Sequence, residues 1–508
     1  MTTSNNTFNL AACCLAENAA RRPGKTALIL AGAESDRRLT YGQLDLAVRR
    51  LATGFSSLGL PPGARVLIRL GNDLDYALSF FALIAAGLVA LPASAQLTAE
   101  EVDYLREDSG ATAVICPQGL AASSARKSVQ VIDAAEYKKL AAFPPRDYAA
   151  TAPDDPAYLI YTSGTASRPK GVLHAQRVIL GRAPMLDHWL GLTEEDIVLH
   201  AGAMNWTYTL GVGLMDPFVR GATAVLYNGP ADAGVWPRLI ARHKATIFAA
   251  VPGVYRQFLR EESCDAEAFA SLRHGLTAGE ALAPALLEKF AEKTGKPLYE
   301  ALGMSEISTY ISSGPGTPVR PGSPGRAQPG RRVGILPLES GENPVPAGES
   351  GLIAVHRSDP GLMLGYWRKP DAEREVFRGD WFVGGDVAEM DLDGYVWLNG
   401  RRDDLMNAQG YRVSPAEVEA VLSHAPGVAD VAVAERKVRA DVSVICAFIV
   451  SAGGQPNEQG QEALLAAHCA EHLAGYKTPK KYVFVKTLPR TRNGKIARRL
   501  LPEIGSSC

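Results

Sequence analysis

The sequence predicts an α/β protein with a large N-terminal region of layered α/β sheets, a β-rich subdomain and a small C-terminal α+β domain. Helix-like and strand-like segments alternate over the first 150 residues, short strands follow a Gly- and Pro-rich stretch after residue 313, and a new alternation starts beyond residue 400. Such alternation indicates parallel sheets covered by helices. We therefore expect two domains, residues 1–400 and residues 401–508.

Hydrophobic periodicity identifies the N-terminal elements. Leu44, Val48, Leu51 and Phe55 recur at steps of four, three and four residues and predict a helix, after which ARVLIRL is typical of a strand. An apolar helix before LVALPA and the helix EEVDYLREDSG before ATAVICP repeat this order. Further short strands are predicted in DIVLHAG, ATAVLYN and ATIFAAVP, so the region should contain two or more sheets.

The second half of the chain changes character. GPGTPVRPGSPGRAQPG is predicted to contain only turns and loops. GLIAVH, WFVGGDVAEM and YVWLNG read as strands, and Asp393-Gly394 predicts a hairpin turn between the last two. Beyond residue 400, a capping box from Ser414 to Glu417 starts a helix. The strands VADVAVAER and SVICAFIV, the helix EALLAAHCAEHLAGY and the strand YVFV complete the predicted C-terminal domain.

Composition excludes several classes of protein. Of the 508 residues, 46% are hydrophobic and 21% charged, which excludes collagen, a disordered chain and a coiled coil. The 53 Lys and Arg residues balance the 54 Asp and Glu residues to a net charge of −1, so we expect no nucleic-acid partner. Seven scattered cysteines and the absence of a signal-peptide pattern favour a cytoplasmic protein.

The longest apolar run is YALSFFALIAAGLVAL, residues 76–91. It is shorter than the about 20 residues that a membrane-spanning helix needs, and Pro92 follows it. We therefore expect a buried helix that leads into a buried strand, and no membrane insertion.

The most informative segment is YTSGTASRPKG, residues 161–171, which follows the apolar strand AYLIY. Hydroxyl groups, a flexible backbone and a cation at a strand end are the groups that bind a polyphosphate. Pro169 stands where the GxxxxGK[ST] loop requires Gly, so this segment is a different motif; the alternative is an ordinary polar surface turn. The candidate phosphate-binding residues are Thr162, Ser163, Gly164, Thr165 and Lys170.

The chain resembles the acyl-CoA synthetases of the acyl- and aryl-adenylate-forming superfamily. Besides this segment, it contains four further motifs in the same order as that superfamily. The resemblance runs from about residue 10 to residue 500, and the contexts GVLHAQR, DHWLGLTEEDIV and GATAVL are most similar to benzoate-CoA ligases and medium-chain acyl-CoA synthetases. The four motifs are YEALGMSE (299–306), GD (385–386), GRRDDLMNAQGYRVSPAEVE (400–419) and LPRTRNGKIARR (488–499).

The resemblance implies an ATP-dependent acid–CoA ligase. A carboxylate attacks the α-phosphate of Mg-ATP to give an acyl-adenylate and pyrophosphate, and the thiol of coenzyme A then displaces AMP. The implied cofactors are ATP, Mg²⁺ and coenzyme A. Lys495 matches the lysine that stabilises the charge on the α-phosphate, and Glu306 matches the carboxylate that holds Mg²⁺. Without the resemblance, Lys495 would be a solvated lysine in a basic tail and Glu306 a surface charge.

The resemblance also implies which residues bind the nucleotide. Ser305 matches the residue that contacts the α-phosphate, and Asp386 and Arg401 match the pair that contacts the ribose hydroxyls. The alternative for Asp386 and Arg401 is a pair of charges at the end of a hairpin. The segment implied to lie along the adenine consists of Gly279, Glu280 and Ala281.

A mobile C-terminal domain is implied as well. Asp403 matches the hinge about which this domain rotates between the two half-reactions. Gly410 matches the glycine beside the pantetheine tunnel, where the lack of a Cβ atom admits the thiol arm. Arg412 matches an arginine that contacts phosphate in some acetyl-CoA synthetases, with a surface ion pair as the alternative.

The acid site is implied to lie near AGAMNWTYTLGVGL. Trp206 matches an aromatic gate between the acyl pocket and the pantetheine tunnel, with an ordinary core aromatic as the alternative. Tyr208 and Gly211 follow on the helix that lines the acyl site, and Gly303 and Met304 are further substrate-site candidates. Because no Arg, Lys or His is placed in this pocket, a monocarboxylic acid is favoured, either aromatic or short-to-medium aliphatic.

The sequence departs from the family pattern at a few positions. Ala166 and Ser167 replace the usual Thr-Gly of the phosphate segment, Leu302 stands where an aromatic residue often stacks on adenine, and Asn407 replaces a common Lys. None of these changes removes a group that the chemistry requires. Two other functions stay open, a freestanding enzyme that loads a carrier protein and a luciferase-like oxygenase, and a homodimer is one open expectation for the assembly.

Overall fold

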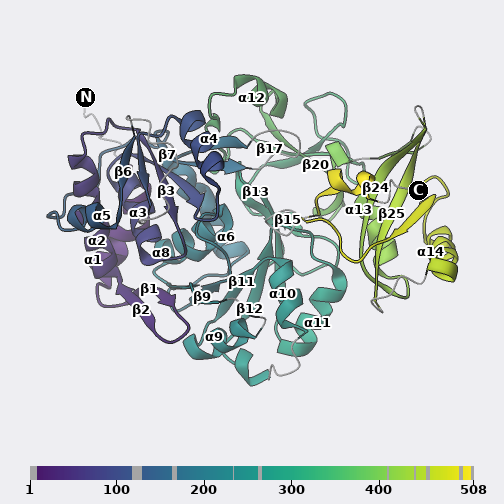
Figure 1. Ribbon diagram of the computed structural model, residues 1–508, viewed down its shortest axis with the longest axis horizontal. Coiled ribbons are helices and arrows are strands. Elements are labelled where there is room, and N and C mark those ends of the chain that lie inside the picture. The colour runs from purple at the N-terminus through teal and green to yellow at the C-terminus, as the bar shows by residue number, and fades with distance from the viewer. Residues whose placement is uncertain are drawn as a thin grey trace. The chain divides into compact units, whose positions relative to one another are not determined.

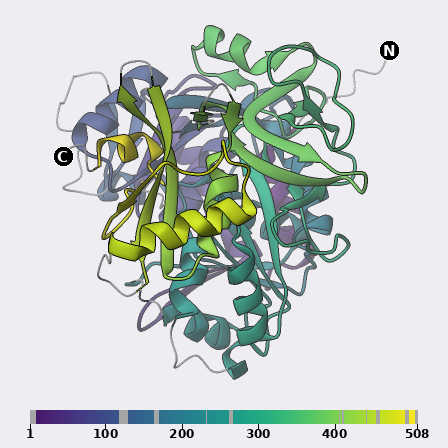
Figure 2. The same cartoon turned by 90° about the vertical axis from the view of Figure 1, so that its right-hand side faces the viewer.

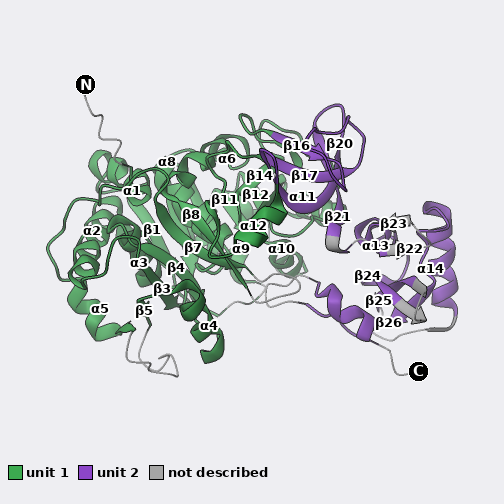
Figure 3. Cartoon of the chain, turned by 90° about the horizontal axis from the view of Figure 1, so that it is seen from above, with its two compact units in different colours: residues 1–332, 356–377 green, residues 333–355, 378–508 purple. Residues whose placement is uncertain are grey.

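The structure is a computed structural model that forms two compact units. The first comprises Met1–Arg332 and His356–Phe377, and the second comprises Val333–Val355 and Arg378–Cys508 (Figure 3). The expected domain boundary after residue 400 stays a prediction. The structure describes residues 8–116, 129–162, 169–230, 232, 234–260, 266–404, 406–408, 411–439, 442–452, 458–490 and 496–504.

The first unit contains a seven-stranded sheet in the order β18-β8-β7-β4-β3-β5-β6. Its strands β7, β4, β3, β5 and β6 are parallel, whereas β8 is antiparallel to both β7 and β18. The bounds are β3 (Arg65–Leu70), β4 (Val89–Ser94), β5 (Ala113–Ile115), β6 (Gln130–Ile132), β7 (Pro156–Thr162), β8 (Lys170–Ala175) and β18 (Gly365–Tyr366).

A second sheet of this unit runs in the order β15-β14-β13-β12-β11-β9-β10-β1-β2. Strands β13, β12, β11, β9, β10 and β1 are parallel, and β2, β14 and β15 add antiparallel pairs at the two ends. The bounds are β1 (Thr26–Ala31), β2 (Asp36–Thr40), β9 (Ile197–His200), β10 (Thr223–Tyr227), β11 (Ile247–Ala250), β12 (His274–Ala278), β13 (Leu298–Met304), β14 (Ser308–Ser312) and β15 (Gly325–Ala327).

Helices connect these strands (Figure 1). The α-helices are α1 (Leu10–Arg21), α2 (Tyr41–Ser57), α3 (Leu74–Ala85), α4 (Ala99–Ser109), α5 (Ala134–Leu140), α6 (Ala183–His188), α7 (Thr207–Leu210), α8 (Asp216–Arg220), α9 (Val235–His243), α10 (Pro252–Phe258), α11 (Pro284–Thr294) and α12 (Pro370–Val376). The 3-10 helices η1 (Gln176–Arg182) and η3 (Ala266–Phe269) and the π-helix η2 (Gly211–Met215) complete the unit.

The helix predicted from the first hydrophobic stripe is α2. A capping box between Thr40 and Gln43 starts it, and all four residues of the predicted stripe are buried. Helices α1 to α3 share one apolar core with β3, β4 and β7 of the first sheet and with β1 and β10 of the second. These helices therefore fill the space between the two sheets. Among the described residues, no helix has the length and apolar character needed to cross a membrane.

The Gly- and Pro-rich stretch was predicted to contain only turns and loops, and this prediction is wrong at one point. Gly325–Ala327 form β15, which pairs with β14. Gly325 has a φ of +123°, and a Cβ atom there would lie 2.1 Å from the backbone of Ser312. The glycine permits this strand because only a residue without a side chain can approach the neighbouring backbone so closely.

The second unit contains the β-rich subdomain and the α+β domain that the sequence predicts. Its strands form the sheets β16-β17-β20-β21, β22-β23 and β24-β25-β26. The bounds are β16 (Val333–Leu336), β17 (Gly351–His356), β20 (Trp381–Met390), β21 (Tyr395–Arg401), β22 (Met406–Ala408), β23 (Tyr411–Val413), β24 (Val428–Arg439), β25 (Val442–Ser451), β26 (Lys481–Phe484), α13 (Pro415–Ser423), α14 (Glu458–His472), η4 (Arg402–Asp404) and η5 (Arg498–Glu503). The strand β19 (Phe377–Arg378) spans the point where the chain passes into this unit.

Strand alternation explains how α13 and α14 are held in the second unit. Val433 and Ala447 belong to one buried cluster, which also contains Leu465 of α14. Their neighbours Ala432 and Phe448 belong to a different cluster. Because successive side chains of a strand point to opposite faces, the two helices cover one face of β24 and β25; α14 crosses these strands in Figure 2. The α/β fold class with a C-terminal α+β domain is thus confirmed.

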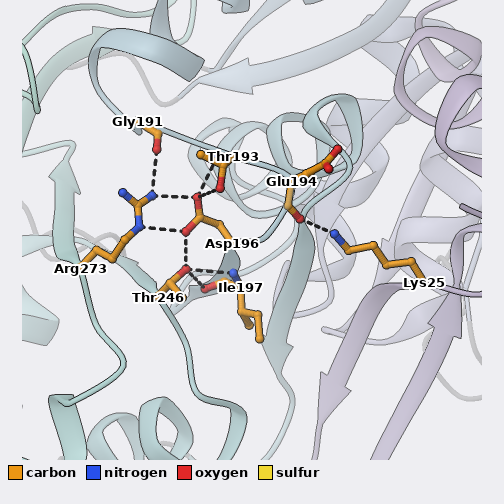
Figure 4. A network of polar contacts seen from close by, with 8 residues as sticks. All are labelled: Lys25, Gly191, Thr193, Glu194, Asp196, Ile197, Thr246 and Arg273. Carbon is orange, nitrogen blue, oxygen red and sulfur yellow. Dashed lines mark hydrogen bonds and ion pairs between the residues drawn. The ribbon is translucent and has the colours of Figure 1, made fainter. Parts of the chain in front are cut away.

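A buried carboxylate joins the beginnings of three parallel strands in the first unit (Figure 4). Asp196 immediately precedes β9, and its carboxylate accepts hydrogen bonds from the Thr246 hydroxyl (2.7 Å) before β11 and from Arg273 (2.8 and 3.0 Å) before β12. The backbone N–H and the hydroxyl of Thr193 donate to the same carboxylate at 2.8 and 2.9 Å. This network fixes the amino ends of the three strands relative to one another.

We predict that Asp196→Asn lowers the free energy of unfolding by roughly 1–3 kcal/mol at pH 7, because the variant loses charge-assisted hydrogen bonds. Burial alone would raise the pKa of Asp196, but the bonds from Thr246, Thr193 and Arg273 outweigh burial and lower it. Its stabilising effect is therefore present above the unfolded pKa of about 3.9 and lost as the pH falls through the lower folded value.

Urea unfolding of the wild type and Asp196→Asn between pH 3 and pH 7 tests this. The difference in the free energy of unfolding between wild type and Asp196→Asn should shrink below pH 4. The control Asp232→Asn, which breaks an exposed pair with Arg238, should have nearly the free energy of unfolding of the wild type at every pH. A difference that is independent of pH would contradict the assignment.

Candidate active site

The predicted phosphate segment lies between two paired strands. Thr162 ends β7 and is the register partner of Lys170, which starts the antiparallel β8. Ser163, Gly164 and Thr165, like the departures Ala166 and Ser167, lie outside the described residues. The pairing of β7 with β8 nevertheless fixes both ends of the segment.

Aromatic side chains anchor these two ends. The hydroxyl of Tyr161 donates to Asp108 at 2.7 Å, and the hydroxyl of Tyr104 donates to the carbonyl of Pro169 at 2.8 Å. The backbone N–H of Trp367 donates to the carbonyl of Gly171 at 2.7 Å. A Cβ atom at Gly171 would lie 3.0 to 3.2 Å from three surrounding side chains, so glycine is needed here for close packing.

Tyr366 brings the predicted metal ligand and the predicted phosphate cation together. Its hydroxyl donates to Oε1 of Glu306 at 2.7 Å, and Nζ of Lys170 lies 5.5 Å from the centroid of its ring, a cation–π contact. The backbone holds the same arrangement, since the N–H of Met363 donates to the carbonyl of Glu306 at 2.8 Å. The sequence analysis missed Tyr366, although the aromatic pair in GYW was a visible signal.

The residues around Glu306 fit a magnesium site. Within the part of the chain that the structure describes, no three His, Cys, Asp or Glu side chains gather into a metal cluster. Mg²⁺ is usually held by one or two carboxylates together with substrate phosphates rather than by a protein cage. A single carboxylate beside a phosphate segment therefore has the right chemistry.

A buried histidine lies near Ser305. Burial lowers the pKa of His174 on β8 to about 3 and outweighs the effect of the Ser305 backbone, which favours a higher pKa. The imidazole is therefore neutral at physiological pH, and it stacks on Tyr158 at 4.5 Å between ring centroids.

The predicted adenine segment follows β12 and begins with a left-handed residue. Gly279 has a φ of +97°, a conformation that glycine adopts without strain. The guanidinium of Arg256 lies 3.3 Å from the carboxylate of Glu280, and Ala281 is exposed. The next residue, Leu282, donates its backbone N–H to Oε1 of Glu300 at 2.9 Å. Glu300, which the sequence analysis did not single out, thus fixes the end of this segment.

The predicted acid-site residues lie on two elements of the first unit. Trp206 is half-buried and directly precedes α7. The ring of Tyr208 stacks on Trp189 at 6.0 Å, meets His200 edge-on at 4.5 Å and donates its hydroxyl to the carbonyl of Leu276 at 3.3 Å.

The other two acid-site candidates, Gly303 and Met304, end β13 and pair with Thr309 and Ser308 of β14. A Cβ atom at Gly303 would lie 2.6 Å from the carbonyl oxygen of Ser308. Glycine is therefore required for the close approach of the two strands at this point.

The second unit holds the predicted ribose pair. Asp386 and Arg401 are register partners in the hairpin of β20 and β21, and their side chains lie 3.4 Å apart. The preceding residues Gly385 and Gly400 have φ values of +84° and +110°. The hairpin geometry therefore depends on glycines and presents the two charged groups side by side.

The remaining predicted residues also belong to the second unit. Asp403 lies in η4, and Arg412 of β23 pairs with Asn407 of β22; their side chains are outside the description. Gly410 and Lys495 lie outside the described residues. An isolated bridge between Arg490 and Ile496 joins the two ends of the segment that contains Lys495.

Comparison with known proteins identifies the family of this chain. Residues 15–367 match the AMP-binding enzyme family, and residues 417–495 match the AMP-binding enzyme C-terminal domain. The chain is 31% identical to benzoate–CoA ligase of Thauera aromatica (94% of this chain, 92% of that protein) and 31% identical to human mitochondrial acyl-coenzyme A synthetase ACSM5 (96% and 87%). The crystal structure of the anthranilate CoA ligase AuaEII in complex with anthranoyl-AMP superposes with a TM-score of 0.89 at 29% identity, over 99% of this chain and 98% of that chain.

The chain belongs to the AMP-binding enzyme family. Its family and the names of its relatives indicate an AMP-forming CoA ligase, an enzyme whose substrates are a small carboxylic acid, ATP and coenzyme A. These findings confirm the predicted resemblance to acyl-CoA synthetases, the predicted α/β fold class and the predicted enzyme class. The roles of the individual site residues stay predictions.

We predict that Glu300→Gln stabilises the protein increasingly as the pH rises. Burial raises the pKa of Glu300 to about 8, so the folded protein keeps a proton that the unfolded chain loses near pH 4.5. Stability from this group is complete below the unfolded pKa and is lost as the pH rises through the folded pKa. The loss amounts to at most about 1.4 kcal/mol per pH unit.

Glutamine carries no titratable proton. The free energy of unfolding of the variant, measured with denaturant, should therefore rise relative to that of the wild type between pH 5 and pH 8. Glu288→Gln, on the exposed side of α11, is the matched control and should follow the wild type at each pH. A constant difference between Glu300→Gln and wild type would show that Glu300 is ionised in the folded protein.

Proposed function

We propose that this enzyme activates a monocarboxylic acid, aromatic or short-to-medium aliphatic, as its acyl-adenylate and then transfers the acyl group to coenzyme A. The observation that carries the proposal is that Glu306 and Lys170 both contact Tyr366. A carboxylate that holds Mg²⁺ and a cation at a phosphate segment are the groups that Mg-ATP requires.

Adenylate formation joins two anions, so it needs positive charge and hydrogen-bond donors around the phosphates. Thr162, Ser163, Gly164, Thr165 and Lys170 bind the β- and γ-phosphates. Ser305 contacts the α-phosphate, and Lys495 stabilises the charge that develops there. Mg²⁺, when bound to Glu306, neutralises phosphate charge. The acid carboxylate attacks phosphorus and pyrophosphate leaves.

Nucleoside binding is assigned to two sets of residues. Asp386 accepts hydrogen bonds from the ribose hydroxyls, and Arg401, 3.4 Å away, orients that carboxylate. Gly279, Glu280 and Ala281 lie along the adenine. The bond from Leu282 to Glu300 supports this role, because it fixes the end of the segment without using a side chain of the segment itself.

Contacts made by the helical segment after Trp206 support a substrate acid with a single carboxylate. The buried arginine next to this segment, Arg182, already donates from Nε and Nη2 to the two carboxylate oxygens of Asp216 at 2.6 Å each. It therefore has no strong pairing to offer a second substrate carboxylate. The apolar and aromatic surroundings of Tyr208 suit the rings named in the benzoate and anthranilate ligases, and Gly303 and Met304 complete the acyl site.

The second step uses the C-terminal part of the chain. Rotation about Asp403 exchanges Lys495 for the groups that admit coenzyme A, with Gly410 beside the pantetheine arm and Arg412 near its phosphates. We place the domain boundary after residue 400 for this reason. We further infer a cytoplasmic enzyme that uses Mg²⁺, and a homodimer is the assembly to test by light scattering.

A screen of carboxylic acids tests the function, with Lys495→Ala as the diagnostic variant. The wild type should release pyrophosphate with an acid of the proposed class and form AMP when coenzyme A is added. Lys495→Ala should lose roughly 10²–10³ in the rate of pyrophosphate release, because the lysine acts where charge develops on the α-phosphate. It should still convert a supplied acyl-adenylate to thioester.

Lys486→Ala, which removes an exposed lysine of the same unit, should leave both half-reactions intact. Equal losses in both half-reactions of Lys495→Ala would reject the assigned role. Product formation only with a carrier protein, or light emission on a luciferin with oxygen, would replace the proposed function.

We predict that Trp206→Ala raises the apparent KM for coenzyme A while the order of preferred acids is kept, because the ring gates the pantetheine path. If the ring is instead a wall of the acyl pocket, bulkier acids should gain kcat/KM by roughly 1–3 kcal/mol per methylene-sized change. Acid profiles and coenzyme A kinetics of the two enzymes separate these outcomes. Unchanged values in both would leave Trp206 as a core aromatic.

A further inference from the structure

Arg182 is a buried arginine without a role in the proposed mechanism. It contacts two segments that are assigned to the first half-reaction. Nε and Nη2 of Arg182 donate to the two carboxylate oxygens of Asp216 at 2.6 Å each, and Nη1 donates to the hydroxyl of Ser308 at 2.7 Å. The side chains of Arg182 and Asp216 are only 3% and 0% exposed. Each edge of the guanidinium therefore has a partner on a different element.

The first partner belongs to the helical segment that is assigned to the acid. Asp216 starts α8, directly after the π-helix η2 and α7 with Tyr208. The contact with this segment is close, since a Cβ atom at Gly211 would lie 2.1 Å from Nη2 of Arg182. Single-turn π-helices occur frequently at functional sites. Arg182 thus lies directly against the segment at the point where its helical geometry changes.

The second partner belongs to the turn that carries the metal ligand. Ser308 follows Glu306 by two residues and pairs with Met304 across the turn between β13 and β14. It has a φ of +73°, a strained conformation for a residue with a side chain. Its hydroxyl accepts from Arg182 and lies 3.8 Å from Sδ of Met185. The strained turn is therefore held at its side chain as well as by strand pairing.

We propose that Arg182 is a positioning residue that fixes the turn carrying Glu306 to the helical segment lining the acid site. This connection would keep the distance between the acid carboxylate and the phosphates constant. The proposal rests on the function proposed above. It extends that function because Arg182 contacts neither substrate and acts only through Asp216 and Ser308.

A second buried pair in the same unit shows that this arrangement is not common to every buried arginine. Arg331 and Asp359 lie 2.7 Å apart and are 2% and 4% exposed, but the other contacts of Arg331 are with Gln328 and the backbone carbonyl of Gly181. Buried ion pairs by themselves contribute little to stability because desolvation offsets their attraction. The three contacts of Arg182 are therefore better explained by positioning than by stability alone.

The test removes one contact and keeps the ion pair. Ser308→Ala deletes the hydroxyl that Nη1 of Arg182 donates to, while Asp216 stays bound. Thr309→Val is the matched control, because Thr309 is the next residue on β14 and its buried hydroxyl has no hydrogen-bond partner in the described part of the chain. Both variants are compared with wild type in pyrophosphate release, in thioester formation from a supplied acyl-adenylate, and in thermal unfolding.

We expect Ser308→Ala to release pyrophosphate about 10- to 100-fold more slowly, since small displacements of reacting groups have effects of this size. Thioester formation and the unfolding temperature should stay close to those of Thr309→Val. Arg182→Lys, which lacks the planar fork, should be slow as well, and the double variant should lose no more than the slower single variant.

Equal pyrophosphate release by Ser308→Ala and Thr309→Val would overturn the proposal, and so would a loss in both half-reactions or a double variant with additive losses. These outcomes differ from failure of the proposed function itself. In that case, the wild type would release no pyrophosphate with any acid of the screen.

Discussion

The return of residues 356–377 to the first unit is the constraint on which the active site depends. This segment follows a complete excursion of the chain into the second unit, yet it supplies Tyr366, which contacts Glu306 and Lys170, and it pairs with β8. Lys170 and Glu306 are far apart in the sequence. Glu306 contacts the returning segment through the backbone of Met363 and the side chain of Tyr366. Lys170 contacts the ring of Tyr366, and its neighbour Gly171 accepts a backbone hydrogen bond from Trp367.

The sequence predicted the regular parts of the fold well because hydrophobic periodicity records burial directly. The stripe from Leu44 to Phe55 is the buried face of α2, and WFVGGDVAEM is β20 from its first residue to its last. It failed at β15, where Gly325 reads as a turn former. The strand there exists because the absence of a side chain lets two backbones meet, which is a property of the partner strand and not of the local pattern.

The sequence offers candidate site residues where a short motif stands, and it misses residues whose contacts join distant segments. Glu306, Asp386 and Arg401 stand in recognisable motifs, and the structure pairs the last two in one hairpin. Tyr366, Glu300 and Arg182 act through partners 60, 18 and 126 positions away in the chain. No local pattern contains such a partner, so these residues appear only once the chain is folded.

The network around Asp196 has a consequence for how this enzyme can diversify. It joins β9, β11 and β12 at their amino ends, whereas Trp206 and the segment from Gly279 to Ala281 follow the carboxyl ends of β9 and β12. The stabilising network and these candidate site residues thus lie at opposite ends of the strands of one sheet. Under the proposed function, mutations at the carboxyl ends that change acid specificity would leave the Asp196 network intact, which favours this scaffold for directed evolution.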